Sequence, residues 1–189
     1  MDSLIATRDS SNEIDAPSLA RFKELYKKPA EYIIRAPGRA NIIGEHIDYN
    51  GYSVLPFALQ QGITIYCSVS DDATVHLANT NESAFSQTEF SAVDPSFDYK
   101  VCHHWSNYVR AGFLGAQELY EKQTGKNRKE REWKGVNLLV SGTVPFVKPL
   151  FQPKNVAFHN AYFIFRQLGC QVLARLSCPP GWRPSEPMI

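Results

Sequence analysis

One short segment gathers most of the side chains that could do chemistry. Residues 35–56 read RAPGRANIIGEHIDYNGYSVLP and place Arg39, Glu45, His46 and Asp48 among small residues. Ionised carboxylates are rarely buried without a partner, and glycine lets a backbone approach a ligand closely. The segment is therefore predicted to be a ligand-binding loop. An exposed charged turn is the alternative interpretation of the same spacing.

The elements that must position this loop begin upstream of it. Ser18 is expected to cap a short helix that runs to Tyr26 and stops at the Lys-Lys-Pro sequence of residues 27–29. Residues 32–35 have the pattern of a strand, and residues 37–38, Pro-Gly, are expected to turn the chain into the loop. The loop is thus expected beside an edge of a sheet.

Further elements follow downstream of the loop. Residues 63–69 alternate apolar and polar side chains, and residues 74–77 are a second strand candidate, so the two are expected to pair as a hairpin. A helix is expected from about residue 106 to residue 122, followed by a basic turn over 125–131 and a strand over 136–140. This irregular alternation without repeats predicts an α+β domain whose sheet has mixed strand direction.

Composition and charge exclude several classes of function. The chain has 189 residues, enough for one domain with a sizeable core, and its formal net charge of +1 gives no electrostatic reason to bind nucleic acid. Residues 1–17 form a polar leader without the pattern of a signal peptide, and no apolar run has membrane-spanning length. We expect a cytoplasmic location and neither nucleic-acid nor membrane partners, and no pattern indicates an oligomeric state.

The cysteines suggest neither disulfides nor a metal centre. The four cysteines are scattered without a CxxC pair, and they are expected to remain reduced and inert. Cys102, His103 and His104 form the one cluster that approaches a metal-binding pattern. Adjacent residues on a strand or a helix face different directions, so no metal site is predicted there.

The loop also resembles a known signature. GRANIIGEHIDYNGYSVLP is similar to the galactokinase signature of the GHMP kinase family, and its form IIGEHIDYNGYSVLP is most similar to the N-acetylgalactosamine kinase branch. LANTN at residues 77–81 and WSNYVRAGFLGAQE at residues 105–118 resemble the same branch. The resemblance runs over about residues 32–145. It implies that residues 18–146 form the N-terminal half of a GHMP-kinase-like domain, with a mixed sheet packed against helices.

The resemblance implies a role for each polar residue of the loop. Arg39 would lie beside the C1 hydroxyl of a sugar, where its charge would stabilise phosphoryl transfer. The other polar groups would hydrogen-bond sugar hydroxyls, and a site of this kind rejects analogues that lack a hydroxyl. The substrate-binding residues implied in this way are Glu45, His46, Asp48, Gly51 and Tyr52.

The resemblance further implies the cofactors and the reaction. Trp105 and Tyr108 would border the adenine of ATP, with Mg²⁺ as the accompanying ion, although aromatic residues at helical spacing more simply pack against a core. The expected activity of the family is ATP-dependent phosphorylation of galactose or N-acetylgalactosamine at C1. The alternative is a non-catalytic sugar-binding or regulatory relative, and the sequence does not choose between the two sugars.

The sequence departs from the family pattern after residue 146. Galactokinases carry a second motif, a glycine- and serine-rich loop that holds the nucleotide phosphates, and neither this loop nor the later aspartate base is present in this sequence. Residues 147–189 form an irregular tail with proline clusters and weak periodicity. The chain is therefore expected to be truncated, with little or no turnover. A non-functional, aggregation-prone product is a third interpretation.

The codons of the tail suggest its origin. If the first two bases of each codon over residues 169–176 are joined to the third base of the codon before it, the genetic code permits Gly-Leu-Ser-Ser-Ser-Ser-Ala-Leu, which is the missing phosphate motif. Residues 147–148 and 165–166 can be encoded by splice donor and acceptor sequences. We therefore expect residues 147–166 to be translated intron and residues 167–189 to be an exon in the wrong frame. A regulated short isoform is the alternative.

Overall fold

The architecture is defined for most of the region that precedes the tail. In the computed structural model the description begins at Asp15, just before a helix, and ends at Thr143, just after a strand in the middle of a sheet. The predicted tail over 147–189 lies outside the described residues, as does most of the predicted polar leader. The structure describes residues 15–44, 47, 50–96, 104–125, 127 and 133–143.

Two helices and five strands make up the described part of the chain, so the predicted α+β class is confirmed. Each strand candidate from the sequence is present but longer than predicted, and the predicted second helix is found within two residues of its expected end. The elements are α1 (Ala16–Tyr26), β1 (Tyr32–Ile43), β2 (Leu55–Val69), β3 (Thr74–Asn79), β4 (Thr88–Ser91), α2 (Ser106–Thr124) and β5 (Val136–Gly142).

The strands form one mixed sheet in the order β1-β2-β5-β3-β4. β5 pairs antiparallel with β2 and parallel with β3, which confirms the predicted mixture of strand directions. The predicted hairpin of β2 and β3 is wrong, because β5 lies between them. Residues 136–140 of β5 are all buried, and a strand buried on both faces takes a central place in a sheet.

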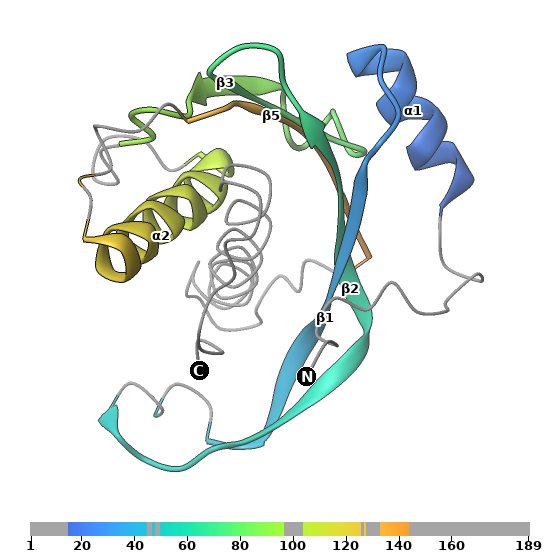
Figure 1. Ribbon diagram of the computed structural model, residues 1–189. Coiled ribbons are helices and arrows are strands. Elements are labelled where there is room, and N and C mark those ends of the chain that lie inside the picture. Colours follow the sequence, from blue (N-terminus) through green and yellow to red (C-terminus); the bar gives the residue numbers. More distant parts are fainter. Residues whose placement is uncertain are drawn as a thin grey trace, which may run out of the picture.

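The two helices cover opposite faces of the sheet, and the sheet curves around α2 (Figure 1). On the α2 face, Val109, Phe113 and Ala116 pack with apolar residues of β2, β3, β4 and β5. On the other face, Phe22 of α1 packs with Tyr66 and with apolar residues of β3 and β5. The main core therefore lies between α2 and the sheet.

Helix α1 starts earlier than predicted. Its N-cap is Asp15, and Pro17 occupies the first turn, where the fixed φ of proline suits a helix and its missing N–H costs no hydrogen bond. The prediction of Ser18 as the cap is therefore wrong, and the buried Ser18 hydroxyl instead donates to the Asp15 carboxylate. At the far end, the Tyr26 hydroxyl donates to the Leu138 carbonyl over 2.8 Å, which ties α1 to the central strand.

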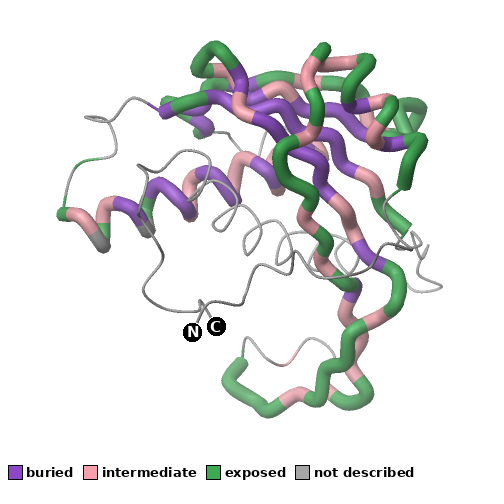
Figure 2. The backbone as a smooth tube through the Cα atoms, turned by 45° about the vertical axis from the view of Figure 1, so that its right-hand side comes forward, coloured by how far each residue is buried: buried purple, intermediate pink, exposed green. Residues whose placement is uncertain are grey.

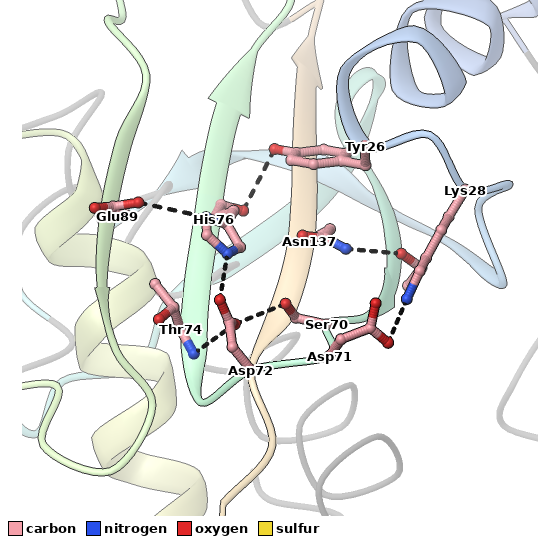
Figure 3. Close-up of polar contacts among 10 residues, drawn as sticks. Tyr26, Lys28, Ser70, Asp71, Asp72, Thr74, His76, Glu89 and Asn137 are labelled. Carbon is pink, nitrogen blue, oxygen red and sulfur yellow. Dashed lines mark hydrogen bonds and ion pairs between the residues drawn. The ribbon is translucent and has the colours of Figure 1, made fainter.

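A network of polar contacts fixes the turn between β2 and β3 on the α1 side of the sheet (Figure 3). The Asp72 carboxylate accepts hydrogen bonds from the Ser70 hydroxyl at 2.8 Å and from the Thr74 N–H at 2.9 Å. Its other oxygen lies 3.3 Å from His76 Nε2. The hydrogen bond from Ser70 and then that from Thr74 hold the pKa of Asp72 below its ordinary value.

This lowered pKa predicts a pH dependence. A group whose pKa is lower in the folded state contributes stability that is present above its unfolded pKa of about 4 and is lost as the pH falls through the folded pKa. We expect the urea midpoint of the Asp72→Asn variant to fall less than that of the unmodified chain between about pH 5 and pH 2. The amide keeps an oxygen for Ser70 and Thr74, so equal pH profiles would contradict this assignment.

β1 continues through the sequence that was predicted to turn. The expected turn at residues 37–38 is wrong, since β1 runs on to Ile43 and β2 starts as early as Leu55. β1 is an edge strand, where a proline without an N–H is tolerated. The far halves of β1 and β2 form a two-stranded arm beyond the main sheet, defined as residues 37–43 and 55–62, and Figure 2 shows that much of it is exposed.

Candidate functional site

The predicted ligand loop lies at the end of the arm. The two strands pair as far as Ile43 with Leu55, so the loop joins them from Gly44 to Val54. Figures 1 and 2 both place this end of the arm away from α2 and from the body of the sheet. The arm thus carries the loop on an extended, largely exposed support.

The ends of the loop approach each other closely at its neck. Gly44 has a φ of 99°, and a Cβ placed on it would lie 2.6 Å from Cγ1 of Val54. The Asn41 side-chain amide donates to the Gly44 carbonyl over 3.4 Å. Only glycine has both the backbone freedom and the small size that this contact requires. The neck therefore fixes where residues 45–53 emerge from the arm.

A tight turn shapes the second half of the loop. The N–H groups of Asn50 and Tyr52 both donate to the Ile47 carbonyl, over 3.1 Å and 3.4 Å. Gly51 has a φ of 81° and open space around it, and Tyr52 is 68% exposed. Both residues are accessible to a ligand, and their predicted role in binding substrate stays a prediction.

The charged residues of the loop are described only in part. Glu45, His46 and Asp48 lie outside the described residues. Arg39 is half-buried on β1 opposite Ala58, four residues before the start of the loop neck at Ile43 and Gly44. Arg39 therefore has a defined place on the arm. Its predicted catalytic role and the sugar contacts of the three loop residues remain predictions.

The two aromatic residues predicted near a nucleotide pack within the domain. The Trp105 indole N–H donates to the Ser86 carbonyl over 3.0 Å, and its ring meets that of Phe85 edge-on at 5.8 Å between centroids. Tyr108 is half-buried against the main core, and this burial raises the pKa of its phenol to about 12. These contacts are those of the packing alternative, and the predicted place of Trp105 and Tyr108 beside ATP stays a prediction.

The described part of the chain shows neither a cluster of metal ligands nor a membrane-spanning helix. Within the described ranges, no group of three His, Cys, Asp or Glu side chains is placed to hold a metal ion. Cys102 and His103 lie outside those ranges. Of the cysteines, Cys67 is described, and it is buried with a free thiol whose pKa is raised to about 12, first by burial and then by Glu31. Neither described helix is long and apolar enough to cross a membrane.

Sequence reasoning missed the residues that shape the arm. Asn41 and Val54 were not singled out, although they close the neck of the loop. Gly62 was also missed, and it is buried where the arm leaves the sheet. The sequence did contain a signal at Gly62. A glycine that lies within a strand and has no turn residues beside it indicates a bulge or a close approach of another backbone.

Comparisons with known proteins agree with the position of this loop. Residues 20–69 match the family model of the galactokinase galactose-binding signature. The galactokinase of Dictyostelium discoideum is 42% identical over 130 residues, which are 66% of this chain and 24% of that relative. The galactokinase of Schizosaccharomyces pombe is 36% identical over 136 residues, which are 69% of this chain and 26% of that relative. The chain thus spans about a quarter of the length of these curated relatives.

Solved structures show the same likeness. Galactokinase of Lactococcus lactis, in a crystal structure complexed with galactose, matches 85% of this chain and 37% of its own, with a TM-score of 0.57 and 26% sequence identity. Mevalonate kinase of Methanococcus jannaschii matches 76% of this chain and 39% of its own, with a TM-score of 0.54 and 12% identity. The second match shows a likeness of fold alone.

Proposed function

We propose that this chain belongs to the galactokinase-like part of the GHMP kinase family, as its signature predicted, and that its signature loop binds galactose. One observation carries the proposal. The match to the galactose-binding signature over residues 20–69 includes the arm and the whole loop, which supports sugar recognition by this segment.

The proposal assigns the predicted roles to the loop. Glu45, His46 and Asp48 hydrogen-bond the sugar hydroxyls, since charge-assisted hydrogen bonds to hydroxyls are strong. Gly51 lets the backbone approach the sugar, and Tyr52 presents an exposed ring and hydroxyl to it. N-acetylgalactosamine is the alternative ligand, which the resemblance of the signature to that branch favours.

We propose that phosphorylation itself belongs to a longer product of the same gene. ATP with Mg²⁺ supplies the phosphoryl group in this family, and Arg39 would face the developing charge at the sugar C1 hydroxyl. Without a phosphate loop and a base, roughly several kcal/mol of positioning and charge stabilisation are absent. This chain therefore turns over little or no sugar, and Trp105 and Tyr108 act mainly in packing.

The shifted reading frame of the tail supports this division. Removal of the codons for residues 147–165 and of two bases of codon 166 joins residues 145–146, Pro-Phe, to a phosphate motif two residues later. We propose that the spliced message encodes the active kinase. Sequencing the message across this junction tests the proposal, and the finding of unspliced message alone would contradict it.

A second function, that of a non-catalytic sugar-binding protein, is favoured by one specific observation. The sugar signature is present, while residues 147–189 stand where the family pattern places the phosphate motif, and this supports a protein that binds sugar without phosphorylating it. A cytoplasmic location remains part of this proposal.

The proposed function predicts stabilisation by sugar without turnover. A ligand that binds only the folded state at about 100 times its Kd adds about 2.7 kcal/mol of stability. We expect galactose or N-acetylgalactosamine, but not glucose, to raise the thermal midpoint by several degrees, and no ADP to form when ATP and Mg²⁺ are added. An unchanged midpoint with both sugars would contradict binding, and rapid ADP formation would contradict the proposed loss of turnover.

A further inference from the structure

The arm leaves the sheet through a β-bulge. Pro37 pairs with Gly62, but the next paired residue of β1, Arg39, lies opposite Ala58. Residues 59–61 of β2 therefore face Gly38 alone. A bulge of this kind bends its strand and redirects the side chains beyond it. Arg39 and the whole signature loop lie beyond this bulge, so its geometry sets their direction relative to the sheet.

Thr143 holds one end of the bulge. The Gly62 N–H donates to the Thr143 hydroxyl over 3.0 Å, and the Thr143 N–H donates to the Gly62 carbonyl over 2.9 Å. The same hydroxyl lies 3.2 Å from the Gly62 carbonyl, to which it can donate. Thr143 directly follows the central strand β5. The hydroxyl therefore links the base of the arm to the most buried strand of the sheet.

β1 holds the bulge from the opposite side. A guanidinium nitrogen of Arg35 donates to the Gln60 carbonyl, in the middle of the bulge, over 2.6 Å. Next to it, a Cβ on Gly62 would lie 2.5 Å from the Ala36 carbonyl oxygen, so the two backbones are in close contact. The bulge is thus bonded to both neighbouring strands, through Thr143 on one side and Arg35 on the other.

We propose that Thr143 and Arg35 are positioning residues for the sugar site. They do not contact the sugar, and they fix the angle at which the arm carries the signature loop away from the sheet. This inference rests on the proposed function, because it concerns how the same loop is oriented. Hydrogen bonds weaken steeply when their distances and angles depart from the optimum, so an arm held at another angle binds its ligand poorly.

The test compares galactose affinity with stability in four variants of the full chain. Calorimetric titration with galactose should show a Kd raised about tenfold in Thr143→Val and in Arg35→Met, and a Kd within about twofold of the unmodified value in Thr143→Ser, which keeps the hydroxyl. Thr88→Val is the matched control on β4, at the far edge of the sheet, and should bind normally. Urea midpoints of Thr143→Val and Thr88→Val should be similar.

Each other outcome overturns a defined claim. Unchanged affinity in Thr143→Val and Arg35→Met, or equal loss in Thr143→Ser, would overturn the positioning role while the proposed function stands. The positioning role would also be overturned if each variant lost galactose affinity only in proportion to a fall in its urea midpoint, since Thr143 and Arg35 would then act on stability alone. If the unmodified chain binds neither galactose nor N-acetylgalactosamine, the proposed function fails and this inference fails with it.

Discussion

Replacement of Gly135 by alanine is expected to destabilise the domain by more than about 3 kcal/mol. A Cβ at this position would lie 2.0 Å from the carbonyl oxygen and 2.5 Å from the nitrogen of Thr74, both of them backbone atoms. The Gly135 backbone is also fixed by two hydrogen bonds. Its carbonyl accepts from the Ser70 N–H over 2.9 Å, and its N–H donates to the Asp72 backbone carbonyl over 2.8 Å. No flexible side chain can move aside to relieve this clash.

The expected cost is large compared with the stability of a domain of this size. Overpacking typically costs about 1–3 kcal/mol even where side chains can shift, and a backbone clash should exceed that, against a total of about 5–15 kcal/mol. Urea unfolding followed by circular dichroism measures the loss. Gly142→Ala is the matched control in β5, where the new Cβ would lie 3.9 Å from Ile63 in ordinary contact. Equal midpoints for the two variants would contradict the packing described at Gly135.

Replacement of Asp48 by alanine is expected to abolish the stabilisation by galactose. A site whose polar groups pair with sugar hydroxyls loses about 1.5–3 kcal/mol with each charged hydrogen-bond partner, or about ten- to 100-fold in affinity. His46→Ala should act in the same direction. The arm that carries the loop extends beyond the main sheet, so we expect the urea midpoint without sugar to change little.

The control for this prediction removes an aspartate outside the loop. Asp71 is exposed and forms an ion pair with Lys28 at 2.6 Å in the turn between β2 and β3. Exposed ion pairs contribute about 0–1 kcal/mol, so Asp71→Ala should leave both stability and galactose binding nearly unchanged. If Asp48→Ala and Asp71→Ala bind galactose equally well, the signature loop does not hold the sugar.

The local elements could be predicted where one pattern dominates. The apolar periodicity of α2 and the buried run of β5 gave the right type and nearly the right bounds, and the alternation in β2 identified its inner half. The pairing of strands could not be predicted in the same way. A four-residue connection between β2 and β3 suggested a hairpin, but β5, whose first five residues are buried, takes the place between them.

The site was predictable in its residue types and not in its support. The signature loop is a continuous stretch of sequence, so its polar residues could be read directly, and its resemblance to galactokinases is confirmed. The bulge at the base of the arm depends on Gly62 and Thr143, which are far apart in sequence and meet only because β5 pairs with β2. Pro37 suggested a turn, because its tolerance in an edge strand depends on a sheet order that sequence patterns do not reveal.

The central claim is that the signature loop binds galactose. Its most direct test is to titrate the isotope-labelled chain with galactose and to monitor the backbone amide signals by NMR spectroscopy. The account predicts saturable shifts for amides at the loop and its neck, residues 44–54, and for Arg39 on the arm. It predicts little change for α1 and for the turn between β2 and β3. Shifts absent from the loop at saturating sugar, or confined to the body of the sheet, would contradict it.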